Sequence, residues 1–129
     1  MTTPKKLYTS MEKKYKTKWL KALRGEEYKR CTGTLRRVNK KEKTYSFCCL
    51  GVLCDIMING DGQWDNKLIK NNGRYRSRFI FEGSGSYDMP SDKVNNETGL
   101  TKSSVNMLAR MNDNGASFEK IAKWIEAEL

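Results

Sequence analysis

The chain has 129 residues, with 25 Lys and Arg against 15 Asp and Glu, a net charge of +10 and no histidine. This length fits one domain, residues 1–129, with a core that needs no disulfide bridges. The missing imidazole excludes Ser-His and Cys-His nucleophile pairs and histidine metal ligands, which favours a binding protein over an enzyme. No apolar run has the length of a membrane span, so we expect neither a secretory signal nor membrane association, and we place the protein in the cytoplasm.

The positive charge is concentrated in the first third of the chain. Residues 1–43 hold 15 of the 25 Lys and Arg and 4 of the 15 Asp and Glu, whereas residues 44–129 carry a net charge of −1. Segregated charge of this kind indicates an anionic partner, such as nucleic acid, a nucleotide or an acidic protein face. A basic surface that only solubilises the protein explains the same pattern equally well.

The first half of the chain predicts two helices and a hairpin. Residues 10–24 have the spacing of an amphipathic helix, and Gly25 is a suitable residue to end it. Residues 31–38 and 44–47 predict the two strands of a hairpin. Residues 47–58 are apolar on most sides of a helix, which is typical of a buried central helix.

The middle of the chain carries weaker signals. We expect a loop over residues 59–78, with Trp64 and Tyr75 as anchors to the core. Residues 78–82 predict a strand, and the Gly-Ser run at residues 83–86 predicts a flexible turn.

The C-terminal third predicts helices with recognisable starting residues. Pro90 can begin a short helical turn, Thr101 is a suitable N-cap for a helix through Met111, and Ser117 is a suitable N-cap for the last helix. These two helices resemble the first half of a helix-turn-helix, but only four residues follow Ile125. We therefore expect a plain helical hairpin that does not read base sequence. The predicted fold is α+β, mostly helical, with a small antiparallel sheet and a C-terminal helical hairpin.

The cysteines are more typical of a core than of a site. They are Cys31, Cys48, Cys49 and Cys54. A Cys-Cys-x4-Cys spacing lacks the paired knuckles of a zinc site, and a cytoplasmic context disfavours disulfides. We expect reduced, metal-free and mostly buried thiols, with no metal site, no cofactor and no catalytic residue.

A candidate ligand site combines cations, aromatic rings and polar groups. The candidate ligand-binding residues are Trp19, Arg24, Tyr28, Arg36, Asn112 and Asp113. Arg24 and Arg36 would bind phosphates, and Trp19 or Tyr28 would stack on a base. The polar pair, at a break between helices, would accept hydrogen bonds from a base edge or a ribose. The alternatives are a tryptophan in the core and polar side chains that cap a helix end.

Several segments together are similar to one protein family. The first is Trp-Leu-Lys-Ala-Leu-Arg-Gly-Glu-Glu-Tyr at residues 19–28, and the most specific is Phe-Cys-Cys-Leu-Gly-Val-Leu-Cys-Asp at residues 47–55. Met-Pro at residues 89–90, Gly-Leu at residues 99–100 and Leu-Ala-Arg-Met-Asn-Asp at residues 108–113 follow in the same order. This order resembles a family of small proteins of tailed bacteriophages and prophages, and it covers nearly the whole chain. The chain departs from the family in its lysine-rich N-terminus and in residues 60–88.

The resemblance implies a viral accessory protein in the cytoplasm of a bacterial host, and it supplies no catalytic residues. With the basic N-terminal third, it favours a host-defence antagonist that sequesters an anionic nucleotide-type signalling molecule. Such a protein needs a concave pocket, often across the interface of a homo-oligomer. The alternatives are a sequence-nonspecific nucleic-acid-binding protein, which needs a basic groove, and an inhibitor of a host protein, which needs an exposed apolar patch.

Overall fold

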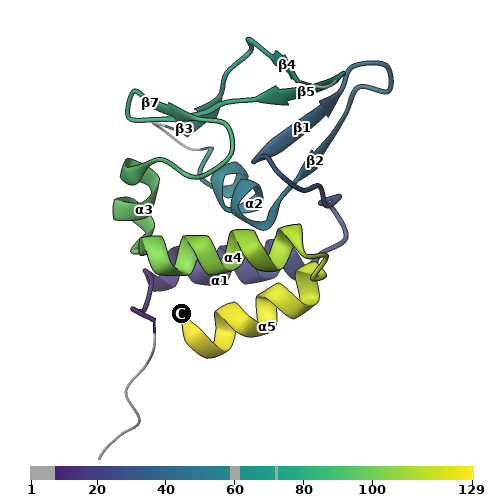
Figure 1. Ribbon diagram of the computed structural model, residues 1–129. Helices are drawn as coiled ribbons and strands as arrows, with labels where there is room; N and C mark the ends of the chain where they lie inside the picture. The colour runs from purple at the N-terminus through teal and green to yellow at the C-terminus, as the bar shows by residue number, and fades with distance from the viewer. Residues whose placement is uncertain (1–7, 59–61, 72) are drawn as a thin grey trace, which may run out of the picture.

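A buried helix lies at the centre of the fold. The computed structural model describes residues 8–58, 62–71 and 73–129. Helix α2 (Cys49–Ile56) lies between a layer of helices and two small antiparallel sheets (Figure 1). Residues 49–54 are all buried, which confirms the central helix that the apolar run predicts. The helix is shorter than predicted because Cys48 serves as its N-cap and Met57 as its C-cap.

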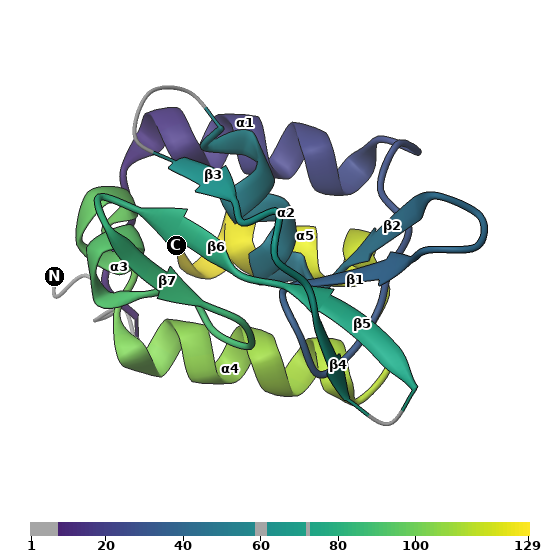
Figure 2. The same cartoon turned by 90° about the horizontal axis from the view of Figure 1, so that it is seen from above.

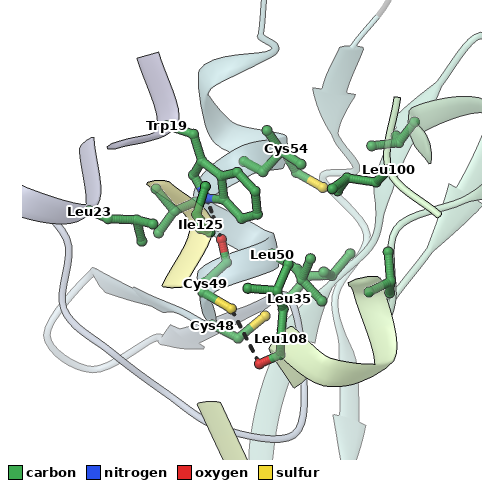
Figure 3. Close-up of a cluster of buried hydrophobic side chains, with 14 of the residues drawn as sticks. Trp19, Leu23, Leu35, Cys48, Cys49, Leu50, Cys54, Leu100, Leu108 and Ile125 are labelled. Carbon is green, nitrogen blue, oxygen red and sulfur yellow. Dashed lines mark hydrogen bonds between the residues drawn. The ribbon is translucent and has the colours of Figure 1, made fainter. Parts of the chain in front are cut away.

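Close packing around α2 depends on a glycine. A Cβ atom on Gly51 would lie 1.8 Å from the backbone oxygen of Leu35, so only glycine fits at this position. Figure 3 shows the side chains of Leu35 and Leu50 in the same cluster as the cysteines. The backbone before the first strand therefore packs directly against the central helix.

The helical layer consists of α1 (Lys13–Arg24), α4 (Lys102–Asp113) and α5 (Phe118–Glu128), which lie on the side of α2 away from the sheets (Figure 1). Thr101 and Ser117 accept hydrogen bonds from backbone N–H groups at 3.2 and 3.1 Å, which confirms both predicted N-caps. The C-terminal helical hairpin is confirmed. The short helical turn after Pro90 is helix α3 (Asp92–Thr98), capped by Ser91.

Two antiparallel sheets cover the other side of α2. The first has the strand order β2-β1-β5-β4, and the second has the order β3-β6-β7. Their strands are β1 (Arg36–Asn39), β2 (Thr44–Phe47), β3 (Gly62–Trp64), β4 (Ile69–Asn71), β5 (Arg74–Ser77), β6 (Phe79–Phe81) and β7 (Ser84–Ser86). Only Arg78 separates β5 from β6, so the chain passes directly from one sheet to the other. The α+β fold class is confirmed.

The prediction of a loop over residues 59–78 is wrong for most of that range, although residues 59–61 and 72 lie outside the described residues. Strands β3, β4 and β5 occupy it. These strands are short and built mostly from polar residues, so they lack the apolar run that marks a strand in a sequence.

The prediction of a flexible turn at residues 83–86 is also wrong. Glu82 and Gly83 form a tight turn with φ values of 48° and 82°, and residues 84–86 form the strand β7. A Cβ on Gly85 would lie 2.4 Å from the Arg78 side chain, so this strand accommodates an arginine that packs across its backbone.

Candidate functional site

The structure places Trp19 in the core, so its predicted role as a stacking platform is wrong. Its side chain is 0% exposed, and its indole N–H donates a hydrogen bond of 2.9 Å to the backbone oxygen of Cys49 (Figure 3). The aromatic residue of a basic amphipathic helix thus faces inward, and the lysines around it face solvent.

Asn112 is also structural. It is 0% exposed, its side-chain oxygen accepts a hydrogen bond from the N–H of Cys49 at 3.0 Å, and its side-chain nitrogen donates to the oxygen of Cys31 at 2.8 Å. Its amide therefore has no free group to offer a ligand, and the prediction that it accepts hydrogen bonds from a base or ribose is wrong. Asp113 is exposed and accepts a hydrogen bond from the N–H of Gly33 at 3.1 Å.

Arg24 is neutralised by carboxylates of α5. Its guanidinium lies 2.8 Å from Glu126 and 3.7 Å from Glu119. The hydrogen bond from Arg24 lowers the pKa of Glu126, as expected for a carboxylate beside a guanidinium. Because its charge is already paired, Arg24 fits a contact between α1 and α5 better than a phosphate site.

Tyr28 and Arg36 lie in a half-buried cluster around Asp55. The carboxylate of Asp55 accepts hydrogen bonds from the hydroxyl of Tyr28 at 2.5 Å and from the indole N–H of Trp64 at 2.9 Å. Burial and this hydrogen bond raise the pKa of Tyr28, so its hydroxyl stays protonated. Both oxygens of Asp55 have protein partners, which makes this carboxylate a fixed acceptor that joins α2 to two aromatic side chains.

Arg36 is held between two aromatic rings. Its guanidinium carbon lies 4.3 Å from the centre of the Tyr45 ring and 4.5 Å from that of Trp64, and its Nε donates a hydrogen bond of 2.7 Å to Ser77. Burial lowers the pKa of Arg36, but a guanidinium remains charged at neutral pH. Its cation–π contacts fix the Tyr45 ring, which is 51% exposed.

A cleft of about 580 Å³ lies beside Tyr45. It is lined by residues of strands β1, β2 and β5, which lie side by side in one sheet (Figure 2). We call it the basic cleft. Its lining residues are Lys29, Arg37, Val38, Asn39, Lys40, Lys41, Thr44, Tyr45, Ser46, Gly73, Arg74 and Tyr75. The lining thus contains five cations and no carboxylate.

The cations of the basic cleft have no ion-pair partner among the described residues, although Glu42 of the same hairpin turn hydrogen-bonds the lining residue Asn39. Within the described ranges, none of the five cations forms an ion pair, and the one polar contact of their side chains is that of Arg37 with the backbone oxygen of Thr32, at 3.0 Å. The Lys40 ammonium lies 4.3 Å from the centre of the Tyr75 ring. Uncompensated cations that line a concave surface create a local positive potential, which attracts anions.

The other hollows suit a nucleotide less well. A cleft of about 520 Å³ contains Tyr28, but its lining pairs Lys18 and Lys21 with Glu26 and Glu27, so its charges cancel. The pocket beside Asn112 and Asp113 measures about 90 Å³, which is below the range of small-molecule sites. Among the described residues, no group of three or more cysteines and carboxylates is placed to hold a metal ion.

The basic cleft contains residues that the sequence analysis did not assign to a ligand site, among them Tyr75, which we expected to be an anchor to the core. Arg74 and Tyr75 belong to β5, which pairs with β1 although more than thirty residues separate them in the chain. Arg37 and Lys29 belong to the basic segment recognised in the sequence, and Lys40 with its neighbour Lys41 lies in the polar turn of the predicted hairpin. A lysine-rich hairpin turn was the one local signal for this surface.

The fold and this cleft define a small α+β protein with a basic, tyrosine-bearing surface at one end of a sheet. Over residues 11–129 the chain matches the family described as "Domain of unknown function (DUF8296)", and it belongs to that family. No curated protein and no solved structure matches it. In the part of the chain that the structure describes, no helix combines the length and the apolar character needed to cross a membrane.

Proposed function

We propose that the protein binds a phosphorylated, nucleotide-type ligand in the basic cleft and acts by binding rather than by catalysis. The observation that carries this proposal is the lining itself, in which five cations and two tyrosines gather without a carboxylate. Phosphate oxygens suit the cations, and a base suits an exposed tyrosine ring. A cleft of about 580 Å³ lies within the size range of sites that hold small molecules.

The cleft also supports this function better than the inhibition of a host protein. A protein-binding surface needs aromatic or apolar anchors grouped in one patch. Among the described residues, the large hydrophobic side chains that are well exposed are Tyr45, at 51%, and Ile58, at 45%. Tyr45 belongs to the basic cleft, and Ile58 does not line it, so they form no shared apolar patch there.

The biological role that we propose is sequestration of an anionic nucleotide signal by a viral accessory protein in the cytoplasm of a bacterial host. The first part of this role rests on the charge and shape of the basic cleft. The second part rests on the resemblance of the sequence to phage and prophage proteins. A protein that only sequesters its ligand needs affinity and abundance but no reacting group.

Isothermal titration calorimetry of the purified protein tests the proposal, with mononucleotides, cyclic nucleotides and short oligonucleotides as ligands. We expect at least one of these ligands to bind, and the triple variant Lys40→Ala, Lys41→Ala, Arg74→Ala to bind it at least tenfold more weakly. A tenfold loss corresponds to about 1.4 kcal/mol.

The matched control is the triple variant Lys102→Ala, Lys120→Ala, Lys123→Ala. It removes the same charge from exposed positions on α4 and α5, outside the basic cleft. Equal losses in the two variants would mean that net charge, and not the cleft, attracts the ligand. If none of the nucleotide ligands binds, the proposed function is wrong.

A further inference from the structure

We infer that the ligand of the basic cleft carries at least two nucleotides in one chain, with one base against Tyr45, one against Tyr75 and a phosphate at the Lys40 ammonium, which lies 4.3 Å from the centre of the Tyr75 ring. This inference rests on the proposed function and narrows it, because a mononucleotide could use only half of the cleft. The ligand class is a short stretch of sugar-phosphate backbone with unpaired bases.

The spacing of the two tyrosines is the first argument. In the four-stranded sheet, Tyr45 of β2 and Tyr75 of β5 both pair with Val38 of β1, from opposite sides. Directly paired residues project to the same face of a sheet, and neighbouring strands lie about 4.8 Å apart, so the two tyrosines start about 10 Å apart on one face. Stacked rings lie about 3.4 Å apart. One base therefore cannot stack on both tyrosines, whereas two bases can.

The state of each ring is the second argument. Arg36 occupies one face of the Tyr45 ring, yet the residue is still 51% exposed, so the ring is both fixed and open to solvent. The ammonium groups of Lys40 and Lys70 lie 4.3 and 5.8 Å from the centre of the Tyr75 ring. Lysine side chains are flexible, so both ammonium groups can move from the ring to a phosphate when a base takes their place.

The number of charges is the third argument. A terminal phosphate of a mononucleotide carries about −1.5 to −2 charges at neutral pH, which leaves most of the five cations without a partner. These cations come from three segments, namely Lys29 beside β2, the β1–β2 hairpin and the start of β5. A backbone with several phosphates can reach cations on all three segments.

The position of the cleft favours unpaired bases over a duplex. Base sequence in a duplex is read by an element that enters a groove, usually a helix. The helices α1, α4 and α5 form a layer on the side of α2 away from the sheets (Figure 1). The basic cleft is lined mainly by residues of the four-stranded sheet and its β1–β2 turn, and none of its lining residues belongs to these helices. Tyr45 is exposed and Tyr75 is half-buried, and tyrosines on a sheet stack on bases only when those bases are unpaired.

The test compares ligands of increasing length by calorimetry and by fluorescence anisotropy, using the full chain. The ligands are thymidine monophosphate, the 5′-phosphorylated dinucleotide dT2, a cyclic dinucleotide, single-stranded dT10 and a duplex of ten base pairs. We expect dT2 to bind at least tenfold more tightly than the monophosphate, and the duplex to bind more weakly than dT10. Tighter binding of the cyclic dinucleotide than of dT10 would identify a free signal as the source, and the reverse order would identify a nucleic-acid strand.

Tyrosine variants separate stacking from charge. Tyr45→Leu and Tyr75→Leu should each weaken the binding of dT2 about tenfold and reduce its advantage over the monophosphate. The matched control is Tyr8→Leu, because the Tyr8 ring packs against Trp124 of α5, 4.9 Å away and outside the cleft. Circular dichroism confirms that each variant is folded.

The salt dependence of dT10 binding counts the phosphate contacts. Each contact to a single strand contributes about −0.7 to the slope of log K against log salt, so five contacts give about −3.5 and the cleft triple variant about −1.4. Equal affinities for the monophosphate, dT2 and dT10 would overturn the inference and leave the proposed function intact. Equal affinities for dT10 and the duplex would also overturn it. No binding of any ligand would overturn both.

Discussion

Replacement of Asn112 by alanine removes the side chain that ties α4 to two other segments. The buried side-chain amide accepts a hydrogen bond from the N–H of Cys49, the first residue of α2, and donates one to the carbonyl of Cys31. The first N–H groups of a helix have no partner within the helix, so this N–H loses its acceptor in the variant. A buried polar group without a partner costs about 1–3 kcal/mol, so two such groups should lower the free energy of unfolding by about 2–6 kcal/mol.

Urea denaturation monitored by circular dichroism measures this loss. With a slope of about 2 kcal/mol per molar urea, the midpoint of Asn112→Ala should fall by at least about 1 M. Asn106→Ala is the matched control, because Asn106 is exposed on the same helix, and its effect should stay within about 0.5 kcal/mol.

A second substitution at this position tests the hydrogen-bond pattern. Asn112→Asp keeps an acceptor for Cys49, but at neutral pH it has no donor for the Cys31 carbonyl and introduces a buried charge. Its penalty relative to the native protein should shrink as the pH falls and the carboxyl becomes protonated, because the acid form can donate again. A loss below about 1 kcal/mol for Asn112→Ala, or a penalty for Asn112→Asp that does not depend on pH, would refute the assigned role.

Three further predictions follow from the core. Gly51→Ala should destabilise the protein by more than about 2 kcal/mol in urea denaturation, because the new Cβ would lie 1.8 Å from the Leu35 carbonyl oxygen. A fully stable variant would show that the backbone at Leu35 can move away at little cost. Burial raises the pKa of Cys48 to about 12. The thiol therefore ionises at a lower pH in the unfolded protein than in the folded one, and this ionisation favours unfolding. The free energy of unfolding should fall as the pH rises above about 9. Thiol reagents at pH 8 should also modify the native protein far more slowly than the protein in urea. Trp19→Phe should cost about 1–3 kcal/mol in the same denaturation, because it removes the hydrogen bond of the indole to Cys49 and puts a smaller ring in a fully buried site. It should leave nucleotide affinity unchanged. Weaker binding with unchanged stability would return Trp19 to the ligand site.

The helices could be predicted from the sequence because their signals are local. The apolar spacing of each helix lies within a few turns, and the caps at Thr101 and Ser117 are single residues next to the helix that they begin. The burial of Cys49 and Cys54 followed from the same spacing, and all four cysteines are buried. The strands β3, β4, β5 and β7 could not be found in this way, because they have three or four residues each and are held by pairing with distant segments.

The candidate site was harder to predict than the fold because composition does not say which side of an element faces inward. The interleaved aromatic and basic residues around Trp19 were equally consistent with a binding face and with a core face, and the structure shows the core face. Arg36 does lie next to the basic cleft, through its contact with Tyr45. The opposite wall, with Arg74 and Tyr75, depends on the pairing of β5 with β1, which no local pattern indicates.

The stacking of Arg36 between Tyr45 and Trp64 connects a ring of the basic cleft to an indole ring through one cation. Tyr45 lies in the basic cleft, whereas Trp64 lies in the other sheet, with its indole N–H on Asp55. A ligand that draws the guanidinium toward a phosphate would change the charge above the Trp64 ring, and indole emission responds to a nearby charge. The remaining tryptophans have different surroundings, since Trp19 is sealed in the core and Trp124 packs against Tyr8. We therefore expect nucleotide binding to change the intrinsic fluorescence of the unlabelled protein, and Trp64→Phe to abolish that change.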